Sequence, residues 1–185
     1  MMARVSPDSD VETVPPAARP RRIGVFVCVA AIVLALDIVS KVLVVANLQP
    51  GERTRLFGGA IYLDIARNSG AAFSLGTGFT AILTLIAIAV VVVIVRAAKR
   101  LHSRGWAIAF GLILGGALGN LVDRIFRAPG VFRGYVVDWI SLFGPDAEHW
   151  PIFNLADSAI VCGAILAAAL SLFGVALDGK RGNRD

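Results

Sequence analysis

The chain has 185 residues, and 57% of them are hydrophobic. Its mean hydropathy of +0.75 is high for a soluble domain, so the composition favours a membrane protein with several spans. The net charge of +5 does not indicate nucleic-acid binding, because the basic residues lie between hydrophobic segments rather than on one face.

The first 22 residues form a polar segment. Four of them are proline, at positions 7, 15, 16 and 20. A segment of this composition buries too little apolar surface to offset the entropy that it loses on ordering. We therefore expect residues 1–22 to form a disordered cytoplasmic tail.

Four long apolar runs follow, and each approaches or exceeds the ~17–25 residues with which a helix crosses a bilayer. They extend over residues 23–48, 79–95, 106–122 and 152–177. The pattern predicts an all-α membrane protein with four transmembrane helices, which form one domain over residues 23–177. Residues 178–185 then form a short cytoplasmic tail.

The basic residues predict how these helices are oriented. Arginines and lysines precede the first run, fill the short loop between the second and third runs, and follow the fourth run. By the positive-inside rule these segments, and hence both termini, are cytoplasmic, and the loops at 49–78 and 123–151 face outward. An alternative is that the first run is a cleaved signal peptide. Its length, and Asp37 within it, favour a retained helix.

Two stretches of the outer loops have the composition of β-strands. Residues 55–67 place apolar and aromatic residues around a Gly58-Gly59 turn, and residues 131–140 are rich in β-branched and aromatic residues. We expect a small extracytoplasmic β-rich subregion that rests on the membrane surface.

Asp138 and Asp157 carry most of the functional information. Each lies where a very apolar segment meets a polar loop. An ionisable group beside lipid is costly, so it tends to be present for a function, and two such groups that meet suggest an acid/base pair. Asp157 also lies beside Asn154 at a predicted helix start. A capping role is the alternative there, because helix N-termini favour negative charge.

Other polar residues lie within or beside the apolar runs. Asp37 and Lys41 are four residues apart, which predicts a structural ion pair within the first helix. Asn120, Asp123 and Arg124 share a face at the end of the third helix, either as an interfacial cap or as a polar wall beside a substrate. A serine–lysine dyad that uses Lys41 is a further alternative.

Glycines, cysteines and histidines support simpler interpretations. Gly111, Gly115 and Gly119 recur every four residues on the third helix, which predicts close approach by another helix. Cys28 and Cys162 lie far apart within apolar runs, and we expect two buried thiols without a disulfide. The two histidines are isolated, so we predict no metal site.

Five ordered sequence blocks resemble the lipoprotein signal peptidase family (signal peptidase II). They are Asp37 with Lys41, residues 68–74 (NSGAAFS), residues 115–124 (GGALGNLVDR), Val136-Val137-Asp138 and residues 153–157 (FNLAD). The resemblance covers most of the chain, and the order of the five blocks makes it specific.

The resemblance implies an aspartyl endopeptidase of the bacterial inner membrane that needs no cofactor. The catalytic aspartates of the family fall on Asp138 and Asp157, and we place Asp37, Lys41 and Asp123 in supporting positions. The substrate-contacting positions of the family fall on four further polar residues: Asn68, Asn120, Arg124 and Asn154.

The implied substrate is a prolipoprotein whose cysteine already carries diacylglycerol, and the cut falls just before that cysteine. The expected partners are this substrate and membrane lipids, and we expect a monomer with its active site at the outer face. Two alternatives from other classes remain. A small transporter or channel subunit would also use intramembrane charges, and a non-enzymatic binder would hold lipoprotein precursors without cleaving them.

Overall fold

The computed structural model describes residues 20–49, 51–70 and 79–180. Residues 1–19 of the predicted disordered tail lie outside the described residues. So do residues 71–74 of the second sequence block and residues 181–185 of the predicted C-terminal tail.

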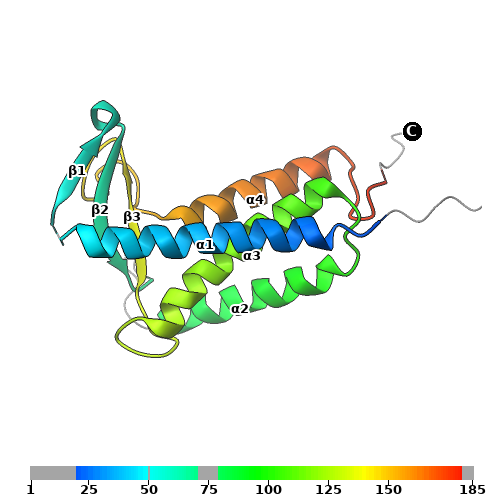
Figure 1. Cartoon of the computed structure of the whole chain (residues 1–185), viewed down its shortest axis with the longest axis horizontal. Helices are drawn as coiled ribbons and strands as arrows, with labels where there is room; N and C mark the ends of the chain where they lie inside the picture. The colour runs from blue at the N-terminus through cyan, green and yellow to red at the C-terminus, as the bar shows by residue number, and fades with distance from the viewer. Residues whose placement is uncertain (1–19, 50, 71–78, 181–185) are drawn as a thin grey trace, which may run out of the picture.

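Four helices run along one long axis, and a small sheet lies across one end of the bundle (Figure 1). The helices are α1 (Ile23–Asn47), α2 (Phe79–Ala98), α3 (Arg104–Phe126) and α4 (Leu155–Leu172). Each is long and apolar enough to cross a membrane, which confirms the four predicted transmembrane helices. Successive helices run in opposite directions, so the sheet lies where α1 and α3 end and where α2 and α4 begin.

α4 occupies less of the fourth apolar run than predicted. The run extends to residue 177, but the helix ends at Leu172, and Gly174, with a φ of 66°, lets the chain turn back. The carbonyl group of Leu177 then accepts hydrogen bonds from the backbone N–H groups of His102 and Ser103, at 3.0 and 3.1 Å. The residues after α4 are therefore tied to the start of α3.

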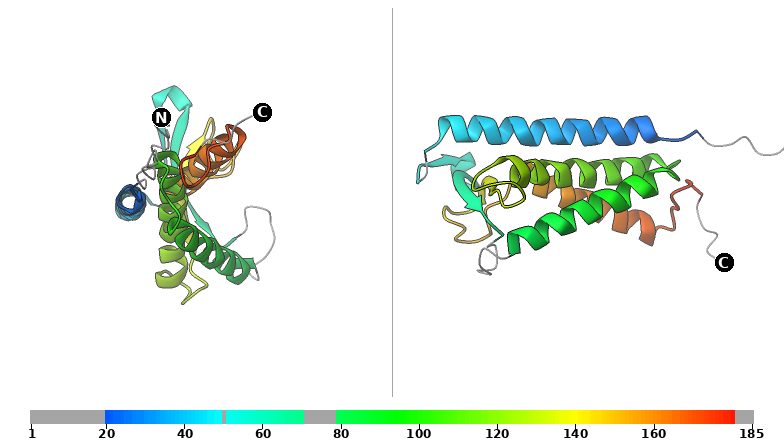
Figure 2. Two further views of the ribbon diagram at one scale, coloured as in Figure 1. Left: turned by 90° about the vertical axis from the view of Figure 1, so that its right-hand side faces the viewer. Right: turned by 90° about the horizontal axis from the view of Figure 1, so that it is seen from below.

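α3 is the central helix of the bundle. It contacts α1, α2 and α4, and Figure 2 shows it lying between α1 and α4. Its predicted glycine face lies against α1, where a Cβ added at Gly115 would stand 2.7 Å from the carbonyl oxygen of Ala30. A Cβ at Gly119 would overlap the carboxylate of Asp37. The prediction of close helix approach at these glycines is confirmed.

Replacing Gly116 with alanine is expected to destabilise the bundle by about 1–3 kcal/mol, the range for overpacking a tight interface. The added Cβ would overlap the carbonyl oxygen of Ala156 in α4, and backbone atoms cannot move aside as a flexible side chain can. Thermal unfolding of the purified protein in detergent measures the effect. Gly24→Ala is the control, because a Cβ there meets no atom within 4 Å. Equal losses in both variants would show that the tight α3–α4 contact is not the cause.

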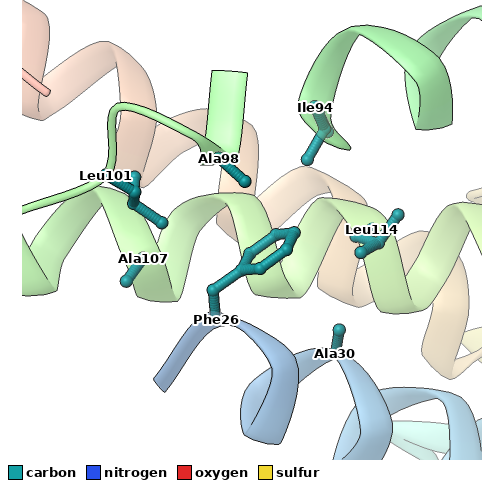
Figure 3. Close-up of a cluster of buried hydrophobic side chains, with 7 residues drawn as sticks. All are labelled: Phe26, Ala30, Ile94, Ala98, Leu101, Ala107 and Leu114. Atoms are coloured by element: carbon teal, nitrogen blue, oxygen red, sulfur yellow. The ribbon is translucent and has the colours of Figure 1, made fainter. Parts of the chain in front are cut away.

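The buried apolar cluster lies toward the end of the bundle that is remote from the sheet. Phe26 and Ala30 of α1 pack there against Ala107 and Leu114 of α3, and Ile94 of α2 completes the contact (Figure 3). Most large apolar side chains on the other faces of α1, α2 and α4 are exposed. An exposed apolar surface is expected for helices that face lipid tails instead of water.

The prediction that the two thiols are buried is wrong. Cys28 and Cys162 are free and exposed on the outer faces of α1 and α4. Their neighbours Val27 and Val161 are 53% and 55% exposed, so these faces point away from the bundle. An apolar run in a membrane protein has the same composition whether it faces lipid or protein, and so the sequence could not separate the two cases.

The small sheet confirms the predicted β-rich subregion. It has three antiparallel strands in the order β1 (Arg53–Leu56), β2 (Ile61–Asn68) and β3 (Val136–Leu142). A short 3-10 turn at Phe57–Gly59 joins β1 to β2, and Gly58 and Gly59 adopt positive φ angles of 68° and 104° there.

β3 begins later than predicted, at Val136 rather than at residue 131. The preceding residues form a turn instead, in which the N–H of Arg133 donates to Gly130 and the N–H of Gly134 donates to the carbonyl of Arg124, both at 3.0 Å. This turn holds the start of β3 against the end of α3. It therefore sets where Asp138 lies relative to the helices.

Candidate active site

Asp138 lies in β3 opposite Ala66 of β2, and only 2% of it is exposed. Its two carboxylate oxygens each accept a hydrogen bond from an asparagine amide. Nδ2 of Asn68, at the end of β2, donates at 2.9 Å, and Nδ2 of Asn154, before α4, donates at 2.6 Å. The sheet and the start of α4 therefore both orient this carboxyl group.

Asp157 lies in the first turn of α4 and is half-buried. It forms a reciprocal capping box with Asn154. The N–H of Asp157 donates to Oδ1 of Asn154 at 2.9 Å, and the N–H of Asn154 donates to Oδ2 of Asp157 at 3.2 Å. Its other oxygen accepts a hydrogen bond from Nδ2 of Asn120 at 2.7 Å. Asp157 therefore has the predicted capping role, and it also contacts Asn120 of α3.

Asn154 brings the two aspartates together. It is fully buried, and it contacts Asp138 through its side chain and Asp157 through both its side chain and its backbone. Its amide also donates to Oδ1 of Asn120 at 3.1 Å. Two carboxyl groups that are remote in sequence thus lie around one asparagine. The side-chain amide of Asn120 donates to Asp157, and that of Asn154 donates to Asp138. These two asparagines therefore orient the aspartates.

The environment of Asp138 changes its acidity. The pKa of Asp138 is raised from 3.8 to about 7, chiefly because burial disfavours the charged form of a desolvated carboxyl group. The charge of Asp157 contributes to this rise, while the hydrogen bonds from Asn68 and Asn154 and the charge of Lys41 oppose it. At neutral pH Asp138 therefore exists in both protonated and ionised forms, which suits a group that donates and accepts a proton.

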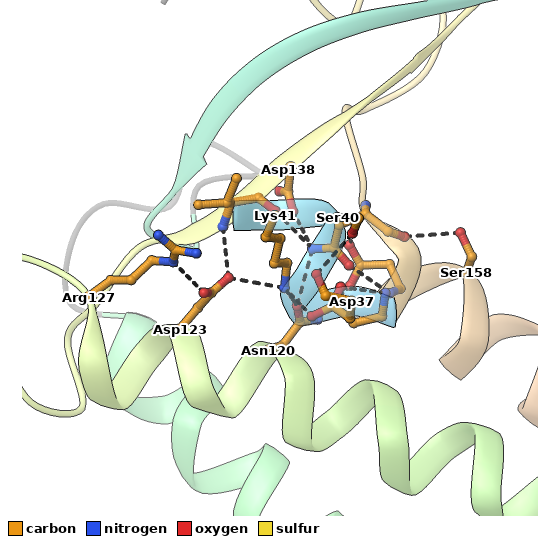
Figure 4. Close-up of polar contacts among 12 residues, drawn as sticks. Asp37, Ser40, Lys41, Asn120, Asp123, Arg127, Asp138 and Ser158 are labelled. Carbon is orange, nitrogen blue, oxygen red and sulfur yellow. Dashed lines mark hydrogen bonds and ion pairs between the residues drawn. The ribbon is translucent and has the colours of Figure 1, made fainter. Parts of the chain in front are cut away.

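Lys41 is the centre of the polar cluster, and Figure 4 shows it reaching from α1 toward Asn120 and Asp123 of α3. It is 1% exposed, and its ammonium group lies 2.7 Å from Asp37, 3.0 Å from Asp123 and 3.0 Å from Oδ1 of Asn120. The ammonium group therefore forms ion pairs with two carboxylates and donates a hydrogen bond to an amide oxygen. The predicted ion pair between Asp37 and Lys41 is present.

The two carboxylates paired with Lys41 hold the elements that carry the aspartate pair. Asp37 accepts a hydrogen bond from the N–H of Ala156 at 3.0 Å, which ties α1 to the first turn of α4. Asp123 accepts one from the N–H of Val137 at 3.1 Å, which ties α3 to β3. Asp123 also pairs with Arg127, a contact that the sequence analysis missed although the i,i+4 spacing was the available signal.

Arg124 is buried at the end of α3, with 8% of its surface exposed. Its charge interacts favourably with Asp138, Asp157 and Asp123. Its Nη1 atom is buried and has no hydrogen-bond partner within the described part of the chain. A buried guanidinium N–H in this position can donate to an acceptor that a ligand supplies, such as a peptide carbonyl group.

A cavity of about 460 Å³ opens beside Asp138. Asn68 and Asp138 form one side of it, and residues 147–152 of the loop between β3 and α4 form the other. No functional residue was predicted in this loop. The signal that the sequence offered there was Trp150, an aromatic residue between two apolar runs.

Two alternative chemistries receive no support from the geometry. The ammonium group of Lys41 binds two carboxylates and an asparagine, while the hydroxyl groups of Ser40 and Ser158 donate to backbone carbonyl groups. A serine–lysine dyad is therefore not formed by these residues. Among the described residues, no group of three or more histidine, cysteine, aspartate or glutamate side chains is placed to hold a metal ion.

Comparison with known proteins identifies the family. The family model described as signal peptidase (SPase) II matches residues 29–173. The chain belongs to the signal peptidase II family. The chain is therefore an aspartic peptidase and a multi-pass bacterial membrane protein, as the sequence resemblance implied.

Three relatives of this chain are named lipoprotein signal peptidase. The protein of Rhodococcus jostii is 52% identical over 90% of this chain and 81% of its own length. The protein of Mycobacterium avium is 51% identical over 94% of this chain and 93% of its own length. The protein of Streptomyces coelicolor is 55% identical over 86% of this chain and 76% of its own length. Two solved structures, both described as bacterial membrane enzymes, share the fold. The first has a TM-score of 0.72 and 28% sequence identity, and the match covers 84% of this chain and 97% of the solved chain. The second has a TM-score of 0.74 and 26% sequence identity, and the match covers 91% of this chain and 99% of the solved chain.

Proposed function

We propose that Asp138 and Asp157 are the catalytic pair with which this signal peptidase II removes the signal peptide from prolipoproteins, cutting before the lipidated cysteine. One observation carries the assignment. Both carboxyl groups bind Asn154 at the junction of the sheet and α4, although they come from different elements. Family membership supplies the reaction, and this geometry supplies the residues.

The pair works by sharing one proton. Two adjacent carboxyl groups do not ionise together easily, and in our scheme Asp138 carries the shared proton when catalysis begins, in keeping with its raised pKa. Asp157, the more exposed partner, then accepts a proton from the attacking water. Asp138 donates its proton to the carbonyl oxygen of the scissile amide. When the amine leaves, Asp157 donates its proton to the leaving nitrogen and Asp138 takes a proton back. Because water is the nucleophile, no covalent intermediate with the enzyme forms.

The charge of the buried cluster supports this proton count. Four carboxyl groups, those of Asp37, Asp123, Asp138 and Asp157, face three cationic side chains. The cations are Lys41, Arg124 and Arg127. One proton held by the aspartate pair makes the cluster neutral. Neutrality lowers the cost of placing so many charges beside lipid.

Substrate binding is assigned to the cavity beside Asp138 and to two of the predicted residues. Asn68 lines that cavity, and Arg124 has the unpartnered N–H group that a peptide carbonyl group would satisfy. Asn120 and Asn154 each donate a hydrogen bond to one of the two aspartates, and we assign them to orienting the catalytic groups toward the substrate. Asp37, Lys41 and Asp123 support the pair by joining α1, α3, β3 and α4.

The sheet end of the bundle is assigned to the outer face of the cytoplasmic membrane, with both termini in the cytoplasm. The basic residues that the structure describes before α1 (Arg21 and Arg22), between α2 and α3 (Lys99 and Arg100) and after α4 (Lys180) lie at the opposite end. A substrate whose signal helix lies in the bilayer, and whose lipid chains lie in the outer leaflet, presents its scissile bond at this face. The enzyme acts as a monomer in this scheme, because one chain supplies every group named above.

Cleavage of a purified diacylglyceryl-modified precursor by the purified protein tests the function. We expect two products, cut before the lipidated cysteine, and no loss of activity in EDTA. Binding of the precursor without products would instead support a non-enzymatic binder. Ion flux through vesicles that contain the protein, with no cleavage, would support the transporter alternative.

The activity is expected to fall above about pH 7, because the pair then loses the proton that Asp138 carries. In the original protein the N–H donor of Asn68 stabilises the ionised form of Asp138 and thereby lowers the pKa of Asp138. Asn68→Ala removes this donor. The pKa of Asp138 is therefore higher in this variant, and the alkaline limb of the kcat/KM profile moves to higher pH. Asn47→Ala, which alters an exposed asparagine on α1, is the control and leaves the limb in place. A limb that moves to lower pH in Asn68→Ala would exclude Asp138 as the titrating acid.

A further inference from the structure

The end of the bundle opposite the sheet contains a polar cavity of about 400 Å³. It lies between the starts of α1 and α3 and the chain that follows α4, and six residues line it: Pro20, Arg22, His102, Ser103, Arg104 and Gly179. Two of the six are arginines, and none is acidic. Asp178 precedes the lining residue Gly179 in sequence, and its Oδ1 atom accepts a hydrogen bond from the backbone N–H of Lys180 at 2.9 Å. The cavity is therefore a basic site at the end of the bundle opposite the aspartate pair.

Arg22 has unused hydrogen-bonding capacity at this cavity. Its Nε atom is buried and has no partner within residues 20–49, 51–70 and 79–180. Its backbone N–H donates to the carbonyl group of Leu101 at 2.8 Å, which fixes Arg22 beside the start of α3. A buried guanidinium N–H without an acceptor is costly, and an anion in the cavity would remove that cost.

Two helix N-termini add positive potential to the same cavity. α1 follows Arg22 with no side-chain cap, and α3 follows Ser103, whose hydroxyl group accepts a hydrogen bond from the N–H of Trp106 at 3.5 Å. Neither helix has an acidic residue in its first turn. The first N–H groups of a helix lack partners within the helix, and they favour anions such as phosphate.

The cavity also borders the apolar surface of the bundle. Ile108 lies one turn after Arg104 on α3 and is 39% exposed, and Ile23 and Val27 of α1 are 39% and 53% exposed. An amphiphile with its head in the cavity could lay its acyl chains along these side chains. A free phosphate ion would leave this apolar border unused.

We propose that this cavity binds the phosphate group of an anionic phospholipid, with phosphatidylglycerol as the test case. Arg22 and Arg104 pair with the phosphate oxygens, and the glycerol part fills the remaining polar volume. In the orientation assigned above the cavity opens to the cytoplasmic leaflet, whose negative surface charge attracts basic segments. The bound lipid would hold the starts of α1 and α3 together, at a distance from the aspartate pair.

Native mass spectrometry of the purified full-length protein in detergent tests the site, with phosphatidylglycerol and phosphatidylcholine as ligands. We expect phosphatidylglycerol to bind more tightly. We also expect the double variant Arg22→Gln/Arg104→Gln to lose about tenfold or more in affinity, because two charge-assisted contacts are removed. The matched control is Arg96→Gln/Arg100→Gln, which removes two positive charges at the same end of the bundle but outside the cavity lining. This control should bind within about twofold of the original protein, because it keeps both phosphate contacts.

Three results would overturn the proposal. Equal losses in the two double variants would show diffuse attraction instead of a site. Equal binding of the two lipids would show that the negative charge is not recognised. Displacement of the lipid by an equal concentration of inorganic phosphate would assign the cavity to a free anion. Arg104→Gln alone, at an exposed position, keeps the test valid if the double variant does not fold, and it should still cleave precursor at the normal rate.

Discussion

Asp138→Asn and Asp157→Asn are each expected to lower kcat for precursor cleavage by about 10²–10⁴-fold or more, the range for loss of a general acid or base. An amide at position 138 has no acidic proton to transfer to the scissile carbonyl group, and an amide at position 157 is too weak a base to take a proton from water. The measurement is turnover of a diacylglyceryl-modified precursor by each purified variant. Near-normal turnover by either variant would remove that residue from the mechanism.

The same substitutions should preserve the fold, because asparagine matches aspartate in size. Each variant keeps one of the two hydrogen bonds that the carboxylate accepts, and the loss of the other costs about 1–3 kcal/mol. Thermal unfolding and precursor binding of both variants check this. Asp146→Asn is the matched control in the same region. It alters an exposed carboxylate that lies 2.5 Å from Arg53 on the sheet, and it should not change the rate. A comparable rate loss in the control would point to a general effect of charge near the sheet.

Lys41→Met is expected to destabilise the protein by about 3–5 kcal/mol, the range for removing one partner of a buried ion pair. The substitution leaves Asp37 and Asp123 buried without their shared cation and removes a donor from Asn120. It should also lower activity, because these contacts hold β3, α3 and α4 around the aspartate pair. Chemical or thermal unfolding in detergent measures the stability, and precursor cleavage measures the activity.

Two comparisons separate burial from charge alone. Lys180→Met removes an exposed lysine whose ammonium group lies 4.0 Å from Asp178, and it should leave the stability nearly unchanged. Adding Asp37→Asn to Lys41→Met removes one uncompensated carboxylate while it keeps an acceptor for the N–H of Ala156. This double variant should therefore be more stable than Lys41→Met. If it is less stable, unpaired charge does not explain the loss.

The aspartate pair illustrates what a single sequence can indicate. Asp138 and Asp157 stood out because each interrupts apolar sequence, and ionisable groups beside lipid are rare without a purpose. The i,i+4 spacing likewise indicated that Asp37 pairs with Lys41. Neither pattern indicated that Lys41 also binds Asp123, because that contact joins α1 to α3 and depends on how closely these helices approach.

Asn154 shows where sequence reasoning stops. Its place before an apolar run is compatible with a helix cap, a substrate contact or a link between two catalytic groups. In the folded chain it caps α4 and also binds Asp138, because the residues just before α4 pair with the middle of β3. Residues 147–152 are a similar case, since their position along the cavity wall follows from the path of the loop and not from their composition.

The sequence by itself determined the number of spans, the presence of a small sheet and the family, because helix length across a bilayer, strand composition and ordered motifs are local properties of the chain. Only the tertiary structure decided which groups meet, which apolar faces point to lipid, and how far burial raises the pKa of Asp138. Those properties depend on distances between residues that are far apart along the chain. The close approach of α1 and α4 to the glycine faces of α3 sets these distances.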